Sequence, residues 1–296
     1  MNRQNRPGTL MIIGGGEDRT DTKTVLQTFL TLAGGMDQPL AIITAASTVP
    51  DKVWDMYRHA FADLGATNVT HVRISCRGDA DDPALAQQMA ASGGIFMTGG
   101  DQKRLLATIG GTRVEQAMRQ AYSHRGACIA GTSAGASAMC THMLAEGRAE
   151  LAPEKGAARL GAGLGFVSRV VIDQHFSQRH RINRLLSVIA QSPFLLGAGI
   201  DEDTALIIHG CALIEVIGDG SVTVVDCRAA HSNMLDLRPG EVPEMIDVRV
   251  HVLPSGSAFS SVPEDERPAC VAEKARAAPP PIAEFIQYLT DWNLES

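Results

Sequence analysis

The chain has 296 residues, of which 45% are hydrophobic and 20% charged, a composition typical of globular proteins and unlike that of disordered or membrane proteins. Its net charge of −7 and its lack of a Lys/Arg-rich block argue against a nucleic-acid partner, which would need a basic surface. No apolar stretch predicts a membrane span, and the polar N-terminus is not that of a signal peptide.

The first half of the chain alternates short apolar runs with amphipathic stretches. The apolar runs predict strands over 9–13, 39–45, 68–74, 94–98 and 127–130. The amphipathic stretches predict helices over 24–33, 53–64, 83–91, 103–109 and 114–123. Parallel strands need helical crossovers of this kind, so we expect an α/β fold with a doubly wound, mainly parallel sheet. Ligands bind such sheets at the carboxyl ends of the strands.

The second half of the chain predicts an antiparallel extension of that sheet. Apolar runs over 212–217 and 221–226 flank Gly218-Asp219-Gly220, a pattern that favours a β-hairpin. Residues 248–253 predict one more strand. The segment 255–281 is rich in Ser, Pro, Glu and Ala, and we expect it to be an extended surface segment before a final helix. We expect residues 1–296 to form a single domain.

The sequence Gly131-Thr132-Ser133-Ala134-Gly135 directly follows the strand predicted over 127–130. It matches the Gly-x-Ser-x-Gly nucleophile elbow, in which the glycines allow a turn tight enough to expose the serine hydroxyl. A turn of small residues that only packs a helix on a strand is the alternative. Its place between a strand and a predicted helix favours the elbow, so Ser133 is the candidate nucleophile of a serine hydrolase.

A serine nucleophile needs a base, and His175 is the best candidate among the nine histidines. It ends the run Asp173-Gln174-His175, which follows apolar residues 168–172 and therefore lies at another predicted strand end. A hydrogen-bonded structural histidine is the alternative, but a carboxylate, an amide and an imidazole at one strand end suit a cleft better than a core. The short separation from Ser133 excludes the common α/β-hydrolase fold, whose histidine lies several strand–helix units beyond its serine along the chain.

Three arginines, Arg179, Arg181 and Arg184, follow the candidate base. In a helix, Arg181 and Arg184 would share a face. Guanidinium groups bind carboxylates in a bidentate manner, so this run predicts an anionic partner. A solvated helix N-terminus is the alternative.

The sequence predicts neither a metal nor a cofactor. Asp173, His175 and His180 could ligate zinc, but no HExxH, HxH or cysteine ligand completes the set. Neither GxGxxG nor GxxxxGKS occurs, which argues against nucleotide binding. The six cysteines show no metal-site spacing, and we expect buried thiols in a reducing compartment, the cytoplasm.

Five motifs between about residues 8 and 253 together carry a family resemblance. They are Gly14-Gly15-Gly16-Glu17, Thr98-Gly99-Gly100-Asp101-Gln102, Gly131-Thr132-Ser133-Ala134-Gly135-Ala136, Ile172-Asp173-Gln174-His175-Phe176 with Arg179 and Arg181, and Gly199-Ile200-Asp201-Glu202-Asp203-Thr204-Ala205. With them the chain resembles the cyanophycinases, which belong to the serine peptidase family that also contains aspartyl dipeptidases of the dipeptidase E type. The resemblance implies a three-layer α/β sandwich of the class I glutamine amidotransferase type and a homodimer. It also implies hydrolysis of cyanophycin to β-aspartyl-arginine dipeptides.

The resemblance also implies roles for individual residues. Ser133 and His175 would be catalytic, and the backbone N–H groups of Gly100 and Ala134 would form the oxyanion hole. The substrate would be bound by Gln102, Asp173, Gln174, Arg179, Arg181 and Arg184.

The acid of the catalytic triad would lie between the serine and the histidine, where Glu146, Glu150 and Glu154 are available; we choose Glu150. Glu202 or Asp203 would meet the arginyl groups of the substrate.

One residue departs from the family pattern. His180 stands where the relatives usually have glycine, and the resemblance implies that its bulkier side chain alters the rim of the substrate cleft. Because of this departure, a second function stays open: an aspartyl dipeptidase or a related hydrolase of small substrates. A catalytically silent binding protein is the alternative from a different class.

Overall fold

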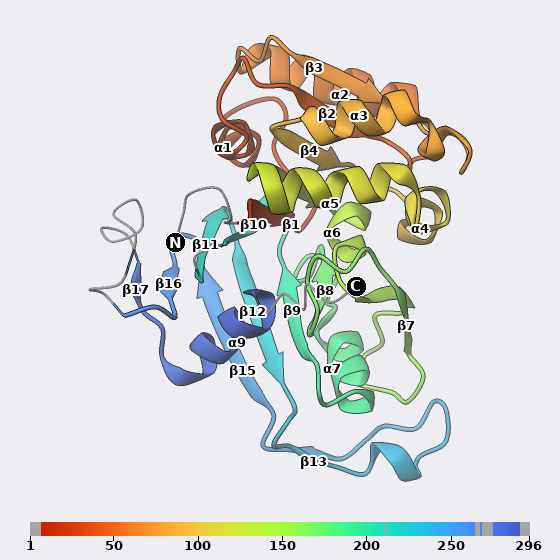
Figure 1. Ribbon diagram of the computed structural model, residues 1–296. Coiled ribbons are helices and arrows are strands. Elements are labelled where there is room, and N and C mark those ends of the chain that lie inside the picture. Colours follow the sequence, from red (N-terminus) through yellow and green to blue (C-terminus); the bar gives the residue numbers. More distant parts are fainter. Residues whose placement is uncertain (1–6, 211, 264–266, 268–274, 291–296) are drawn as a thin grey trace.

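The structure is a computed structural model that describes residues 7–210, 212–263, 267 and 275–290. Its central sheet contains β1 (Thr9–Ile13), β2 (Leu40–Ile43), β3 (Val69–Val72), β4 (Gly94–Met97), β5 (Cys128–Thr132), β10 (Thr204–His209), β11 (Leu213–Gly218), β16 (Ala258–Ser260) and β17 (Arg276–Ala277). The order across this nine-stranded sheet is β17-β16-β11-β10-β1-β5-β4-β2-β3 (Figure 1). In this order, β1, β5, β4, β2 and β3 are parallel to one another, whereas β10 is antiparallel to both of its neighbours, β1 and β11. The predicted α/β fold with a mainly parallel sheet is confirmed.

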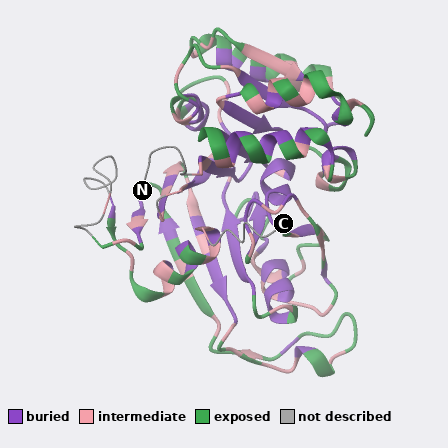
Figure 2. Cartoon of the chain, in the orientation of Figure 1, coloured by how far each residue is buried: buried purple, intermediate pink, exposed green. Residues whose placement is uncertain are grey.

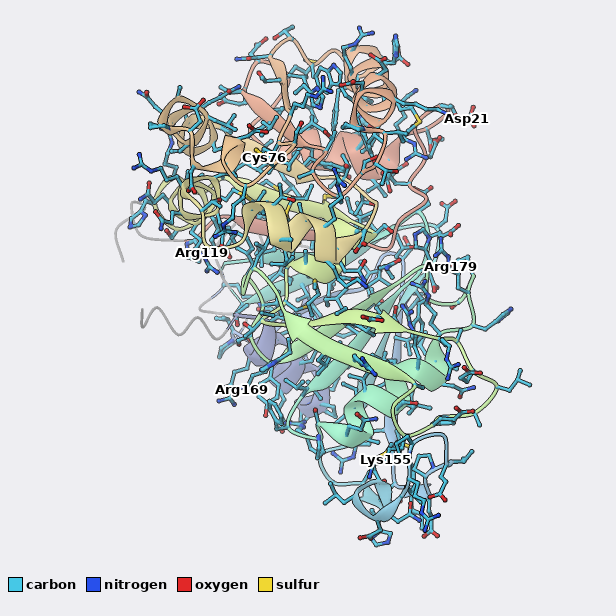
Figure 3. The ribbon with its side chains drawn as sticks, turned by 90° about the vertical axis from the view of Figure 1, so that its right-hand side faces the viewer. Asp21, Cys76, Arg119, Lys155, Arg169 and Arg179 are labelled. Carbon is cyan, nitrogen blue, oxygen red and sulfur yellow. The ribbon has the colours of Figure 1, made fainter. Side chains whose placement is uncertain are left out.

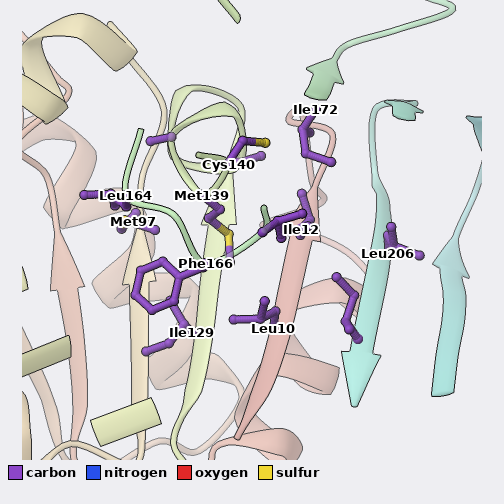
Figure 4. Close-up of a cluster of buried hydrophobic side chains, with 14 of the residues drawn as sticks. Leu10, Ile12, Met97, Ile129, Met139, Cys140, Leu164, Phe166, Ile172 and Leu206 are labelled. Atoms are coloured by element: carbon purple, nitrogen blue, oxygen red, sulfur yellow. The ribbon is translucent and has the colours of Figure 1, made fainter. Parts of the chain in front are cut away.

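Helices cover both faces of the central sheet. They are α1 (Thr24–Leu32), α2 (Pro50–Asp63), α3 (Pro83–Ala91), α4 (Gln102–Ile109), α5 (Arg113–Arg125) and α6 (Ala134–Ala138). Because side chains alternate along a strand, Leu10 and Ile12 of β1 join one buried cluster while Met11 and Ile13 join another. Figure 4 shows part of the first cluster, in which Leu10 and Ile12 pack near Ile129. A strand that is apolar on both faces is typical of a covered parallel sheet.

A second sheet lies beside the first. It contains β8 (Val170–Gln174), β9 (Leu196–Ile200), β12 (Ser221–Asp226) and β15 (Arg249–Pro254), in the order β15-β12-β9-β8. Strands β8 and β9 are parallel and the other two pairs are antiparallel. Ile172 and Val222 of this sheet belong to the same buried cluster as Leu10, so the two sheets share a core, which Figure 2 shows in purple. The helix α7 (Ile182–Gln191) covers the other face, where Leu185 packs near Val171.

The hairpin predicted around Gly218-Asp219-Gly220 does not form. Strand β11 pairs with β10 and β16, whereas β12 pairs with β9 and β15, so this turn carries the chain from one sheet to the other. Gly218 has a φ of +100°, and a Cβ there would lie 1.9 Å from the carbonyl oxygen of Asp203. The N–H of Asp219 donates to that same oxygen at 2.9 Å. The turn is therefore closed against Asp203 and not against the facing strand.

The segment expected at the surface over 255–281 contributes β16 and β17 to the central sheet, with Ala258 and Ser260 buried. Residues 264–266 and 268–274 of that segment lie outside the described residues. The remaining elements among the described residues are β6 (His142–Gly147), β7 (Ala158–Ala162), β13 (His231–Ser232), β14 (Met245–Ile246), two short 3₁₀ helices (Asp79–Asp81 and Met234–Asp236) and α9 (Pro280–Thr290). Within the described ranges, no helix has the length and apolarity needed to cross a membrane.

Candidate active site

Ser133 occupies a strained turn between β5 and α6. Its φ of 52° and ψ of −111° lie in a region that L-residues rarely adopt and that occurs mainly at functional sites. The turn needs its two glycines, because a Cβ at Gly131 would lie 2.4 Å from the carbonyl oxygen of Gly135, and a Cβ at Gly135 would lie equally close, at 2.4 Å, to that of Met97. The N–H of Ser133 donates to the carbonyl of Ile13 at 3.1 Å, which fixes the turn to the end of β1.

Ser133, His175 and Glu202 form a chain of contacts. Ser133 Oγ lies 2.9 Å from His175 Nε2, and His175 Nδ1 lies 2.5 Å from Glu202 Oε1. With Nδ1–H donating to the carboxylate, Nε2 is left as an acceptor for the serine proton. The imidazole is 8% exposed, while Glu202 is half-buried. This is the geometry of a nucleophile, a base and an acid that orients the base.

The electrostatic surroundings favour the neutral form of His175. Burial lowers its pKa from the usual 6.5, and the positive charges of Arg179 and Arg181 lower it further, whereas the hydrogen bond and charge of Glu202 act in the opposite direction. The net result is a lowered pKa, so the imidazole is neutral at neutral pH and can accept a proton.

The loop Gly14-Gly15-Gly16 after β1 packs against this chain of contacts. The carbonyl of Gly14 accepts a 2.7 Å hydrogen bond from the N–H of His175. A Cβ at Gly15, where φ is +92°, would lie 2.4 Å from the imidazole, and one at Gly16 would lie 3.0 Å from the Glu202 carboxylate. These glycines are required by the close approach of backbone to side chain and not by a bound phosphate.

Glu150, which the resemblance led us to expect as the acid, does not take that position. Its carboxylate pairs with Arg148 at 2.9 Å. Of the two other candidates, Glu146 pairs with Lys103 at 3.4 Å, and Glu154 donates its backbone N–H to Ser187 Oγ. The carboxylate at His175 Nδ1 is instead that of Glu202, a residue expected to meet the arginyl groups of the substrate.

Of the two residues expected to form an oxyanion hole, Ala134 directly follows Ser133, and Gly100 is the chain neighbour of Gly99, which lies against Ser133. Ala134 is the first residue of α6, where backbone N–H groups have no acceptor within the helix. Gly100 has a φ of +147°, and a Cβ there would lie 2.2 Å from the carbonyl oxygen of Ala46. Its neighbour Gly99 lies against Ser133, since a Cβ there would be 3.3 Å from the serine Cβ. Among the turn, loop and cap hydrogen bonds of the described residues, the backbone N–H groups of Gly100 and Ala134 donate to no backbone carbonyl.

Asp173, Arg181 and Arg184 form a buried ionic cluster. Asp173 is fully buried, and its carboxylate accepts two hydrogen bonds from Arg184, one of them 2.7 Å from Nε to Oδ2. Arg181 Nη1 lies 3.4 Å from Asp173 Oδ1 and also donates to the carbonyl of Gln174. Burial lowers the pKa of Arg181 to about 10, although the Asp173 charge opposes the shift. These side chains bind one another and hold the end of β8.

The three other expected substrate-binding residues are placed differently. Gln174 Oε1 lies 3.4 Å from Ser133 Oγ, further away than His175 Nε2. Gln102 donates through Nε2 to the carbonyls of Leu144 and Ala145, at 3.0 and 3.1 Å, which leaves its Oε1 as an acceptor. Arg179 is exposed and projects from the surface (Figure 3). Its positive charge lowers the pKa of His175, so its guanidinium is an exposed cation near the imidazole.

The zinc alternative finds no support in this geometry. Asp173 is bound by two arginines, His175 lies between Ser133 and Glu202, and His180 is exposed. The described residues contain no group of three or more His, Cys, Asp and Glu side chains that could hold a metal ion.

A serine that follows β5, together with a neutral histidine that follows β8 and a carboxylate that follows β9, defines a hydrolase. The comparisons agree: residues 10–216 match peptidase family S51, and the chain belongs to that family.

Named relatives are similar over most of the chain. It is 35% identical over 254 residues to a cyanophycinase of Synechococcus elongatus, a match that covers 86% of this chain and 79% of that protein. A cyanophycinase of Geminocystis herdmanii (strain PCC 6308) is 36% identical over 253 residues, with 85% and 93% covered. The crystal structure of a peptidase from an acI-B1 actinobacterium has the same fold, with a TM-score of 0.63 at 22% identity over 87% of this chain and 98% of that one.

Proposed function

We propose that this chain is a cyanophycinase, a serine-type peptidase that hydrolyses cyanophycin to β-aspartyl-arginine dipeptides. The observation that carries the proposal is the contact of Ser133 Oγ with His175 Nε2 at 2.9 Å, backed by Glu202. The similarity to cyanophycinases over most of the chain supports the choice of substrate. Cyanophycin has a poly-aspartate backbone whose side-chain carboxyls carry arginine.

The reaction begins when His175 Nε2 takes the hydroxyl proton of Ser133 as Oγ attacks the scissile carbonyl carbon. The resulting oxyanion accepts hydrogen bonds from the N–H groups of Gly100 and Ala134, each typically worth about 3–4 kcal/mol. The imidazolium then gives its proton to the leaving amine as the C–N bond breaks. Water hydrolyses the acyl-enzyme by the same steps in reverse, and Ser133 regains its proton.

Glu202 supports both halves of this cycle. It holds His175 in the tautomer with the proton on Nδ1 and stabilises the imidazolium that forms after each proton transfer. Because Glu202 is half-buried, its hydrogen bond with His175 is screened less by water than a surface pair would be. In this proposal the strained turn at Ser133 is a nucleophile elbow. The fold is a three-layer sandwich of the class I glutamine amidotransferase type.

Two sets of residues would take part in substrate recognition: one that contacts the substrate and a buried one that holds the first set in place. Arg179, exposed beside His175, would bind a free carboxylate of the polymer. Gln174 and Gln102 would offer amide oxygens to N–H donors of the substrate. Asp173, Arg181 and Arg184 would act by holding Gln174 in place, because their charged groups already bind one another.

Incubation with insoluble cyanophycin and mass analysis of the soluble products tests the function. We expect β-aspartyl-arginine from the wild type and none from Ser133→Ala, which should keep its polymer binding. Cleavage of short α-aspartyl peptides alone would make the chain a dipeptidase. Unchanged properties of Ser133→Ala in every assay would make it a binding protein.

The resemblance to cyanophycinases also leads us to propose a cytoplasmic homodimer. Cys128 and Cys140 are buried free thiols whose pKa is raised by burial, as suits a reducing compartment. Light scattering should give twice the chain mass of 31.4 kDa, and a monomer mass would contradict the dimer.

A further inference from the structure

Glu17 is a buried acid that the mechanism above does not use. It ends the Gly14-Gly15-Gly16-Glu17 motif and is only 2% exposed. Taking a carboxylate out of water costs several kcal/mol unless its oxygens find hydrogen-bond donors. A buried acid so close to Gly15 and Gly16, which contact His175 and Glu202, therefore calls for an explanation.

The partners of Glu17 come from β5, from α2 and from the loop that contains Glu17 itself. Thr132 Oγ1, at the end of β5, donates to Glu17 Oε2 at 2.6 Å. The hydroxyl of Tyr57, in α2, donates to Oε1, and Arg19 Nη1 lies 3.6 Å from the same oxygen. Thr132 and Tyr57 are each 2% exposed, so the carboxylate and its two hydroxyl donors are buried, whereas Arg19 is half-buried. Each carboxylate oxygen has its own hydroxyl donor, and the network is satisfied.

The position of Thr132 links this network to the reaction. It is the residue directly before Ser133, whose backbone is in a strained conformation. The main chain of Thr132 pairs with Ile13 of β1, and its side chain is held by Glu17 four residues further along from Ile13. Both the backbone and the side chain before the nucleophile are thus tied to the segment that also contacts His175 through Gly14 and Gly15.

We propose that Glu17 is a positioning residue for the nucleophile: through Thr132 it fixes the strained turn so that Ser133 Oγ meets His175. This proposal rests on the proposed serine-hydrolase function and adds a residue to it. Small errors in the placement of a nucleophile cost about 100-fold in rate. The link to the nucleophile is geometric: the side chain of Thr132 is held by Glu17, and its main chain pairs with Ile13.

The test uses the full-length chain and an isosteric change. Thr132→Val removes the hydroxyl and keeps the shape, whereas Thr132→Ser keeps the hydroxyl. Thr112→Val is the matched control, since Thr112 is fully buried and its hydroxyl donates to the carbonyl of Ile109 at 2.6 Å. Two rates are measured for each variant: turnover of cyanophycin, and pseudo-first-order acylation of Ser133 by a fluorophosphonate.

We expect Thr132→Val to lower kcat and the acylation rate about tenfold with KM unchanged, and Thr132→Ser and Thr112→Val to stay within about twofold of the wild type. Equal rates for Thr132→Val and the wild type would overturn the proposal, as would an equal loss in Thr132→Ser. If the wild type is acylated but does not cleave cyanophycin, the substrate assignment fails while the acylation rates still decide the role of Glu17.

A double-mutant cycle assigns the effect to Glu17. Glu17→Gln leaves one of the two hydroxyls facing an amide N–H₂ group, so this variant should also be slower. If Glu17 acts through Thr132, the double variant Glu17→Gln/Thr132→Val is no slower than the slower single variant. Losses that multiply would show that the two residues act independently and would overturn the proposal. If Glu17→Gln does not fold, Tyr57→Phe takes its place in the cycle, since it removes the other hydroxyl donor to Glu17.

Discussion

His175 and Glu202 lie 27 residues apart in the chain, yet His175 Nδ1 and Glu202 Oε1 are 2.5 Å apart. The reason is the parallel pairing of β8 and β9, in which Gln174 is the partner of Ile200. His175 follows the first strand directly and Glu202 follows the second by two residues. The carboxyl ends of neighbouring parallel strands therefore bring the proposed base and its proposed acid together.

The first prediction separates Glu202 from Glu150. Glu202→Gln keeps the size of the side chain but no longer holds the proton on His175 Nδ1, so we expect kcat to fall by roughly 10³–10⁴-fold. Glu150→Gln only breaks a surface pair with Arg148 and should change kcat less than about twofold. Steady-state kinetics on cyanophycin measures both, and the opposite ranking would restore Glu150 as the acid.

A second prediction concerns the glycine under the imidazole. Gly15→Ala places a Cβ 2.4 Å from the His175 ring, so the ring must move and activity should fall about 100-fold or more. Gly35→Ala is the matched control, because Gly35 has a similar φ of +103° and no atom within 4 Å of the added Cβ. Its cost is backbone strain of about 1–2 kcal/mol, visible in the melting temperature but not in kcat. Similar activities in the two variants would refute the steric role of Gly15.

The third prediction is a pH dependence. Burial lowers the pKa of His175, and the charge of Arg179 adds to this effect. Since only neutral His175 can accept the serine proton, kcat/KM should rise with pH through a midpoint below the usual 6.5. Arg179→Gln removes a positive charge and should move this midpoint to higher pH, whereas Arg179→Lys should leave it near its original value. A midpoint that moves to lower pH in Arg179→Gln contradicts the assignment.

A fourth prediction addresses stability. Arg184→Ala leaves Asp173 fully buried without its main partner, and we expect the free energy of unfolding to fall by about 3–5 kcal/mol. Arg148→Ala breaks an exposed pair and should cost less than about 1 kcal/mol. Urea unfolding of both variants, followed by circular dichroism, measures the difference. Equal losses would mean that the Asp173 cluster is not a structural unit.

The positions of Ser133 and His175 were predictable from the sequence. Both residues follow apolar runs, which predicted that each lies at the carboxyl end of a strand, where ligands bind α/β sheets. Glu202 follows the run that becomes β9 and offered the same signal. It was missed because the acid was sought between the serine and the histidine along the chain, whereas sheet neighbours decide which residues meet.

The hairpin around Gly218-Asp219-Gly220 failed for a related reason. Two apolar runs joined by a short glycine turn favour local pairing, but the first run pairs with β10 and the second with β9, and both pairs lie in the buried core. Arg179, Arg181 and Arg184 show a different limit of prediction from sequence. Together they predicted a carboxylate partner, and for Arg181 and Arg184 that partner is Asp173 of the same chain.

The division of the site between two sheets has a consequence for the newly made protein. Ser133 follows a strand of the central sheet, whereas His175 and Glu202 follow strands of the second one. On the ribosome the serine is made first, and its base and acid are added later and must dock through β8 and β9. A nascent chain therefore carries an inert serine, and hydrolytic activity appears only once the C-terminal half has been built and folded.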